Sequence, residues 1–417
     1  MTQTTPATDS SEPVAAPGNA LRVRNFRFLW LNNIAFFLVA NAERFLFGSL
    51  VLDHLDRGES EQALVIGALG LPALFLTLHA GVWADRIDRR KMLMTTQMAG
   101  AVVMTCTALL VASGRLTVGW AMLAAAFAGS AAALGSPVRS SLVPALVEKH
   151  QLYSAIAVNA LAMTASLIFG PVVIRAVQRQ VGFAGAFWFQ AGLMLLGVVF
   201  LVQLRVPHHE TVATRRKISA EVRDALSHVW HDNALRTLFG LLIVASLSIN
   251  PAVMVTMQAH VKTALGREAG DAAIPLAFMG LGIAISSVVV MKSGDLPNKG
   301  TLFQRAVIVG SSVTFFIGRS TNFGVVCALA LLMGLAGGFY INMNQGLIQA
   351  STPQALMGRV MALYTLVQAG FMPIGVFVLG NLSEAYGTGA AISGVTAVAF
   401  AIFVTVYVRN AELRRLG

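Results

Sequence analysis

Long runs of apolar residues are the feature that most constrains how this chain can fold. A helix of about 20 apolar residues spans the hydrocarbon core of a bilayer. Apolar types make up 56% of the 417 residues and charged types only 12%, a balance that soluble domains do not show. We therefore predict an all-α membrane protein with twelve transmembrane helices. The predicted spans are Phe28–Val51, Ala63–Trp83, Met92–Val111, Val118–Pro137, Tyr153–Ile174, Ala184–Leu204, Leu235–Gln258, Ala272–Met291, Ala306–Ile317, Asn322–Met343, Val360–Asn381 and Thr388–Val408.

Basic residues favour one side of the predicted membrane. The amino-terminal side holds 22 of the 30 Lys and Arg, Arg139 among them, whereas the opposite loops hold seven and Arg44 lies within a span. Loops that stay in the cytoplasm carry an excess of Lys and Arg. We therefore expect both termini in the cytoplasm and the protein in the inner (plasma) membrane. This topology accounts for the net charge of +11, and no nucleic-acid partner is expected.

A short motif recurs 210 residues along the chain. Gly70-Leu71 begins fifteen residues before Asp85, and Gly280-Leu281 begins fifteen residues before Asp295. Such a repeat predicts two related six-helix bundles, and a membrane chain with a repeat usually has its site between the copies. We expect five parts: a disordered cytoplasmic tail (1–21), a first bundle (22–204), a cytoplasmic linker (205–233), a second bundle (234–409) and a cytoplasmic tail (410–417).

The linker holds a segment with one apolar helical face. This pattern indicates an amphipathic helix along the cytoplasmic membrane surface, and a flexible linker is the alternative. The apolar face is formed by Ile218, Val222, Ala225, Leu226, Val229 and Trp230.

A charged loop lies between the second and third spans. It reads Gly81-Val82-Trp83-Ala84-Asp85-Arg86-Ile87-Asp88-Arg89-Arg90-Lys91. The loop resembles the signature Gly-x-Leu-Ala-Asp-Arg-x-Gly-Arg-Lys of the major facilitator superfamily, although Trp83 replaces Leu and Asp88 replaces the inner Gly. The resemblance covers the chain after about Arg22. It implies the major facilitator fold, in which two pseudo-symmetric six-helix bundles enclose a central cavity.

The resemblance also implies a cytoplasmic latch between the halves. Asp85 would face the start of a helix in the second half, where a carboxylate meets unpaired amides and the positive end of the helix dipole. The alternative is that the basic residues only follow the cytoplasmic charge bias. The second copy keeps Asp295 but lacks the Arg pair, so we expect only the first to latch strongly. The latch residues are Gly81, Asp85, Arg86, Arg89 and Arg90.

A finer resemblance is to exporters of the transmembrane secretion effector type, which include enterobactin and macrolide exporters. Residues 136–144 and 358–363 carry it, and Gly170-Pro171 is similar to the motif of antiporters in the fifth span. The match is partial, because Ile174 and Arg175 stand where that motif has glycines. The fourth predicted span also lacks the arginine of many proton-driven relatives. Export is therefore expected, and the coupling ion stays open.

Glu43 and Arg44 are the only Asp, Glu, Lys or Arg well inside a predicted span. A charge at the centre of a membrane helix costs about 2.5 to 3.5 kcal/mol on insertion scales, so such residues usually face a cavity, find a partner or carry function. Our hypothesis is that Glu43 carries protons and that Arg44 lowers its pKa. A buried ion pair that fixes packing is the alternative, and Asp53 is a weaker second proton candidate.

A substrate cavity is expected between the halves, lined by spans 1, 4, 7 and 10. Aromatic side chains beside amides there would suit a small amphiphilic molecule, such as a drug, a siderophore or a similar metabolite. Asn250 precedes Pro251, which is expected to bend the seventh span. The cavity candidates are Asn32, Phe36, Phe47, Asn250, Phe339, Asn342, Gln345 and Gln368.

Other classes of function lack their motifs. No Gly-x-Ser-x-Gly elbow, metal-spaced cluster or Gly-Lys phosphate loop occurs in the sequence. We therefore expect a transporter that is not an enzyme, with no cofactor or metal and with a proton gradient as its energy source. Its partners would be the small-molecule substrate and the lipid bilayer, and it would act as a monomer. Uptake by symport or facilitated diffusion, and a membrane scaffold that transports nothing, are the alternatives.

Overall fold

The computed structural model describes residues 20–84, 88–148, 151–205, 218–293, 298–353 and 356–414, and this part of the chain is helical without strands. Ten helical segments within it are long and apolar enough to cross a membrane. One of them, α5, contains two predicted spans, and the second predicted span forms α2, which is not among the ten. The protein is therefore an all-α, multi-pass membrane protein, and the number twelve stays a prediction.

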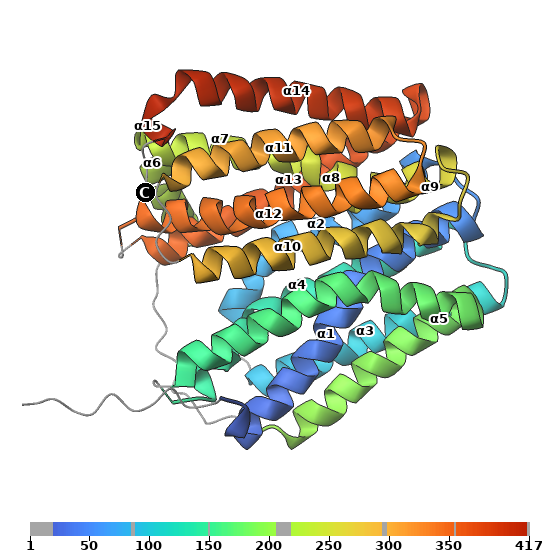
Figure 1. The fold of residues 1–417 in the computed structure, drawn as a ribbon. Coiled ribbons are helices and arrows are strands. Elements are labelled where there is room, and N and C mark those ends of the chain that lie inside the picture. Colours follow the sequence, from blue (N-terminus) through green and yellow to red (C-terminus); the bar gives the residue numbers. More distant parts are fainter. Residues whose placement is uncertain are drawn as a thin grey trace, which may run out of the picture.

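The first half of the chain forms a bundle of long helices (Figure 1). The short η1 (Ala20–Arg22) precedes α1, and α1 ends in the π-helical turn η2. Helix α5 reverses direction at Gly182, where φ is 71°, a left-handed conformation that favours glycine. The long elements are α1 (Arg24–Ser49), η2 (Leu50–His54), α2 (Glu59–Ala84), α3 (Arg89–Ala112), α4 (Val118–Ala145) and α5 (Leu152–Gln203).

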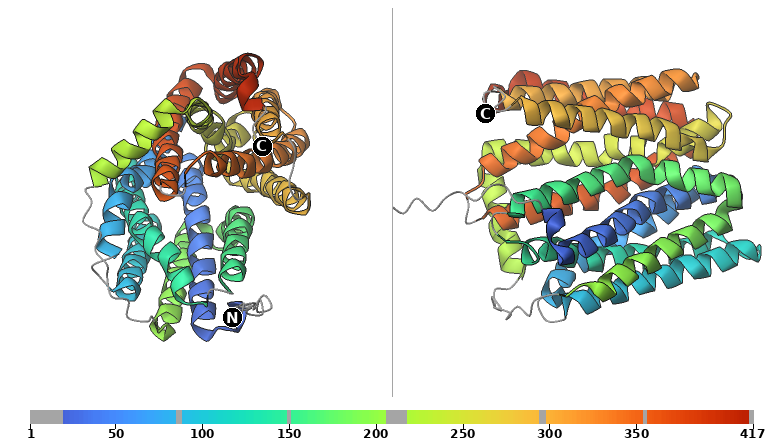
Figure 2. Two further views of the ribbon diagram at one scale, coloured as in Figure 1. Left: turned by 90° about the vertical axis from the view of Figure 1, so that its left-hand side faces the viewer. Right: turned by 60° about the horizontal axis from the view of Figure 1, so that its bottom comes forward.

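The second half forms a similar bundle, reached through the linker helix α6. Figure 2 shows that α1 begins and α14 ends on the same side of the molecule, which we call the termini end, and the opposite side is the far end. The elements are α6 (Ile218–His231), α7 (Asn233–Leu247), α8 (Ile249–Met254), α9 (Thr256–Thr263), η4 (Ala269–Ala272), α10 (Ala273–Lys292), α11 (Lys299–Arg319), α12 (Phe323–Ala350), α13 (Met357–Tyr386), α14 (Thr388–Arg409) and α15 (Ala411–Arg414).

The two halves repeat the same close contact between helices. Gly129 in α4 lies against the carbonyl oxygen of Leu69 in α2, and Gly334 in α12 lies against the carbonyl oxygen of Met279 in α10. Leu69 and Met279 are 210 residues apart, which is the offset of the sequence repeat. Small residues allow this approach, which membrane helices need because no hydrophobic force drives them together.

Gly129→Ala is expected to destabilise the first half. The added Cβ would overlap a backbone oxygen that cannot move aside, and such overpacking costs about 1–3 kcal/mol. Thermal unfolding in detergent measures the change. Gly192→Ala in α5 is the control, because no atom lies within 4 Å of its added Cβ. Equal midpoints for the two variants would contradict this packing.

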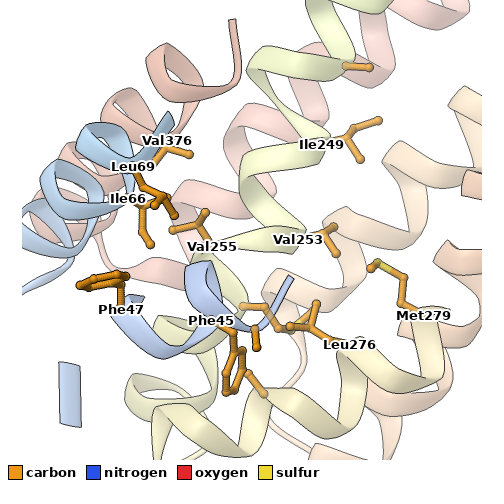
Figure 3. Close-up of a cluster of buried hydrophobic side chains, with 14 of the residues drawn as sticks. Phe45, Phe47, Ile66, Leu69, Ile249, Val253, Val255, Leu276, Met279 and Val376 are labelled. Carbon is orange, nitrogen blue, oxygen red and sulfur yellow. The ribbon is translucent and has the colours of Figure 1, made fainter. Parts of the chain in front are cut away.

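Apolar side chains from both halves form one continuous core. Figure 3 shows Phe45 of α1 and Leu69 of α2 in the same cluster as Val255, Leu276 and Val376 of the second half. The halves therefore share buried apolar surface in this conformation, in addition to their polar contacts.

Two helices differ from the predicted spans in ways that affect the site. Helix α4 continues past Pro137 to Ala145, so Arg139 lies in a helix and not in a loop, and it is only 3% exposed. The seventh span does bend, with breaks at Ser248 and Val255. Pro251 has no amide hydrogen for the carbonyl group of Leu247, and this carbonyl instead lies close to Gly375 of α13.

A helix also forms in the linker. Ala225 and Val229 of α6 are buried, whereas Leu226 and Trp230 are exposed on its surface. Helix α6 contacts α7 and α13. Part of the predicted apolar face thus packs against the second bundle, and the other part is open to a membrane surface or to water.

Candidate functional site

Charged side chains join the two halves at the far end. Arg175 of α5 donates to the carboxylates of Glu268 and Asp271, with 2.8 Å between Arg175 Nη2 and Asp271 Oδ1. Arg179 reaches the same Asp271 oxygen at 2.6 Å. The side chains of Arg175 and Asp271 are 8% and 7% exposed, whereas that of Arg179 is 56% exposed. The buried part of this cluster is therefore the pair of Arg175 and Asp271.

Asp53 adds a second link at the same end. Its two carboxylate oxygens accept the backbone amides of Ala269 (3.0 Å) and Gly270 (3.1 Å) at the start of η4. A carboxylate is favourable there because a helix begins with unpaired amides and the positive end of its dipole. A bond in the opposite direction also joins the halves, because Lys262 of α9 donates to the carbonyl oxygen of Leu52.

Further polar side chains extend this junction. Gln62 Nε2 of α2 donates to Gln258 Oε1 at 2.9 Å, and Gln258 Nε2 donates to the carbonyl oxygen of Phe45 at 2.8 Å. Glu59 of α2 accepts from Thr388 of α14. The far end is therefore closed in this structure by bonds that α1, α2 and α5 make with α9, η4 and α14. We call these contacts the far-end junction.

A polar network lies inside the first half. Arg139 Nη1 donates to Asn32 Oδ1 and, at 2.8 Å, to Asn33 Oδ1 of α1. Its guanidinium carbon lies 3.7 Å from the centroid of the Phe36 ring, in a cation–π contact. Asn32 Nδ2 donates to Gln97 Oε1 of α3 at 2.7 Å. Sequence reasoning missed Arg139 because Pro137 was taken as the end of the span.

Glu43 and Arg139 line the same cavity of the first half. The other lining residues are Phe36, Ala40, Thr96, Gln97, Ala131, Ala132 and Met194. Glu43 is buried and its Oε1 has no hydrogen-bond partner. Arg44 forms no ion pair with Glu43 in the part of the chain that the structure describes. Glu43 thus lies in the wall of a cavity, and its role as a proton carrier stays a prediction.

A second cavity lies within the second half and is mostly apolar. It holds about 80 Å³ of free space between α7, α8, α10, α11, α12 and α13. Asn250 and Gln368 lie in its wall among Ile, Val, Met, Ala and Gly residues, and buried Tyr340 also belongs to the wall. Large apolar walls with a few polar groups are typical of sites for small organic molecules.

The other cavity candidates lie elsewhere. Phe47 is fully buried and packs edge to face on Phe187 within the first half. Phe339 packs against the hydrophobic core. Gln345 is exposed, and the amide of exposed Asn342 donates to the carbonyl oxygen of Gly338 at 2.7 Å. The structure thus brings Asn32 and Phe36 together in one half, and Asn250 and Gln368 together in the other.

The predicted latch falls partly outside the described residues, which omit Asp85 and Arg86. Gly81 lies in the last turn of α2. Arg90 donates to the carbonyl oxygens of Leu201 (2.8 Å) and Val202 (2.5 Å), so it bonds the end of α5 in its own half. Arg89 begins α3, where it is half-buried. The latch between the halves stays a prediction.

The antiporter-like motif lies where α5 meets α1. A Cβ on Gly170 would sit 3.3 Å from the backbone nitrogen of Ala42, so the glycine allows the two helices to approach closely. Pro171 follows inside the helix. Arg175 stands where the motif has a glycine, and here it forms the buried ion pair of the far-end junction.

Comparisons with known proteins extend this picture. The chain is 26% identical to the multidrug efflux pump Tap of Mycobacterium tuberculosis over 361 residues, 82% of this chain and 83% of Tap. It is 24% identical to Tap of Mycolicibacterium fortuitum (82% and 85%). It is 21% identical to the uncharacterized MFS-type transporter YkuC of Bacillus subtilis (81% and 80%).

Solved transporter structures share the fold. The nucleoside transporter NupG aligns with a TM-score of 0.73 at 14% identity, over 92% of this chain and 98% of NupG. A POT family transporter in complex with 5-aminolevulinic acid aligns with a TM-score of 0.74 at 14% identity (94% and 96%). Residues 30–376 match the family model described as Major Facilitator Superfamily. The chain therefore belongs to the major facilitator superfamily of membrane transporters.

Proposed function

We propose that this protein exports a small amphiphilic molecule by alternating access, in exchange for protons. The observation that carries the proposal is the apolar cavity of the second half, with Asn250 and Gln368 in its wall. Such a surface accepts a hydrophobic body and orients it through a few polar groups. The efflux pumps named among the relatives, which align over 82% of this chain, support export as the direction.

In this proposal the protein has twelve transmembrane helices, and its termini end faces the cytoplasm. The two halves rock about the central helices, so that the far-end junction opens when the termini end closes. The far end would then face the exterior, and its closure in the present structure corresponds to the state that receives substrate from inside. The Asp85 latch would hold the termini end in the opposite state, with Arg86 and Arg89 near it.

Glu43 is the proposed proton carrier. It is the buried carboxyl group of the first-half cavity, and a carboxyl group that gains and loses a proton there can couple the gradient to the movement of the halves. One charge that crosses 100 mV carries about 2.3 kcal/mol, which sustains roughly a fortyfold substrate gradient per proton. A pH difference of one unit adds about tenfold.

Transport by inside-out membrane vesicles tests this function. The fluorescent probes are ethidium, a cationic amphiphile, and carboxyfluorescein, an anionic one. We expect vesicles with an acidified lumen to accumulate at least one probe, and an uncoupler to release it. Vesicles without the protein are the control. If neither probe accumulates, or if accumulation requires an alkaline lumen, proton-driven export is wrong, and the second outcome would indicate uptake.

Gly337→Leu is expected to block the second-half cavity without loss of the fold. Gly337 lies in the cavity wall, and a Cβ there would meet only Ile283 at 3.9 Å, so the larger side chain can extend into the space that substrate would occupy. We expect probe export to fall at least about tenfold, because even one methylene group in a close-fitting site is worth roughly 1–3 kcal/mol.

Gly346→Leu is the matched control for this change. Gly346 lies on the same helix, has no atom within 4 Å of an added Cβ, and is not in the cavity wall. Export by this variant should match the parent protein. Unchanged export by Gly337→Leu, at equal expression, would remove the cavity from the transport route.

A further inference from the structure

Two residues that line the first-half cavity each have a buried donor without an acceptor. These donors are Arg139 Nε and Gln97 Nε2, and both residues are 3% exposed and line the cavity. A buried polar group without a partner is costly, so each one calls for an explanation such as a bound water molecule or ligand. Arg139 is thus a buried, charged donor in the wall of a cavity, and Gln97 belongs to the same wall.

The orientation of the network follows from the chemistry of arginine. A guanidinium group only donates hydrogen bonds, so Asn32 must present its oxygen to Arg139. Asn32 Nδ2 therefore faces Gln97, which must present its own oxygen, and Asn32 Nδ2 also donates to the carbonyl oxygen of Gly197 at 3.0 Å. The amide nitrogen of Gln97, Nε2, therefore takes no part in the bond with Asn32. The donors thus run in one direction from Arg139 through Asn32 to Gln97, and the last donor is unused.

The charge of Arg139 is also unpaired. Arg139 takes part in none of the ion pairs found among the described residues, and its contacts are two amide oxygens and the Phe36 ring. The buried Arg175 differs, because two carboxylates surround it. Glu43 lines the same cavity, but no ion pair joins it to Arg139 in the part of the chain that the structure describes. A water molecule could accept from the two donors, but only an anion would also balance the charge.

We propose that this cavity binds the anionic group of the exported molecule, a carboxylate or an anion of similar size. Arg139 supplies the charge, and Gln97 supplies a second donor. The cavity leaves room for about one water molecule, so it fits a small anionic group and not a whole amphiphile. This proposal rests on the proposed function and specifies its substrates as organic anions.

Binding of benzoate tests the proposal without any transport step. Benzamide is the matched neutral probe, because it has nearly the same shape and no charge. Purified protein in detergent is titrated with each at constant ionic strength, and the thermal unfolding midpoint is followed. We expect benzoate to raise the midpoint saturably, with an affinity at least about tenfold above that of benzamide, because charged hydrogen bonds are about twice as strong as neutral ones.

Variants identify the site. Arg139→Gln should lower benzoate affinity at least tenfold, and Gln97→Met should lower it about threefold, since one donor is lost. Arg139→Lys keeps the charge and should retain part of the affinity, which covers the case in which Arg139→Gln does not fold. Arg115→Gln, at an exposed loop position, is the control. Equal shifts by benzoate and benzamide, or benzoate affinity that survives in all three site variants, would overturn the proposal.

The two proposals fail separately. Loss of benzoate binding with continued probe export leaves export intact and removes the anion site. Benzoate binding that depends on Arg139, in a protein that exports no probe, supports the site and contradicts export.

Discussion

Arg175→Gln is expected to open the far end. The change removes the buried charge that pairs with Asp271 and Glu268 across the halves. Breaking a buried ion pair costs about 3–5 kcal/mol. We expect the lower value, because Arg179 and Arg267 still reach Asp271. If the closed state is destabilised by about 3 kcal/mol, the equilibrium ratio of open to closed far ends rises roughly a hundredfold.

Thiol labelling measures this shift. Leu52 is buried at the far end, packed against Ala259 and Ala269 of the second half. In a protein with Cys106 and Cys327 replaced by Ala, Leu52→Cys should react slowly with a membrane-impermeant maleimide. Adding Arg175→Gln should accelerate the reaction by one to two orders of magnitude.

Arg179→Gln is the matched control for the junction. Arg179 pairs with the same Asp271 but is exposed, and exposed ion pairs contribute only about 0–1 kcal/mol. Labelling should therefore change less than about fivefold. Equal acceleration by the two variants would show that total charge, and not the buried pair, holds the far end closed.

Glu43→Gln is expected to abolish proton-driven export. Glutamine preserves the size and polarity of the side chain but cannot exchange a proton, so the step that couples the gradient to transport is lost. Accumulation in vesicles with an acidified lumen should fall to the level of vesicles without the protein. Probe movement down its own gradient should continue without dependence on pH.

Glu61→Gln is the control for this substitution. Glu61 lies in the first turn of α2, where it accepts the amide of Gly58 at 3.0 Å. This variant should export at the parent rate. If Glu43→Gln also keeps the parent rate and its pH dependence, another group carries the proton, and Asp53 is then the next to test.

The sequence predicts the helices well but their ends poorly. Apolar runs report which residues can lie in a bilayer, and helices formed at the predicted positions. Arg139 shows the limit, because neither hydropathy nor Pro137 indicates that α4 continues for two more turns. A membrane helix tolerates proline when its neighbours satisfy the freed carbonyl groups. The count of basic residues therefore assigns Arg139 to a loop, although this residue organises the first-half network.

The candidate site shows a second limit. Polarity within apolar spans predicts that Asn250 and Gln368 line a cavity, and they do, but this cavity lies within the second half and not between the halves as predicted. Phe47 is predicted as an aromatic residue of the cavity wall but packs on Phe187, because a sequence does not specify which face of a helix turns inward. The pair of Arg175 and Asp271 joins residues 96 positions apart, and no local pattern indicates such a contact.

Distances between spin labels at both ends test most directly whether the two halves rock. Arg115 and Thr321 are exposed far-end positions in opposite halves, and Ser140 and Gln349 are exposed positions near the termini end. A change of pH or the addition of probe should lengthen the first distance while it shortens the second, or the reverse. Distances that stay constant, or that lengthen together, would contradict alternating access by this protein.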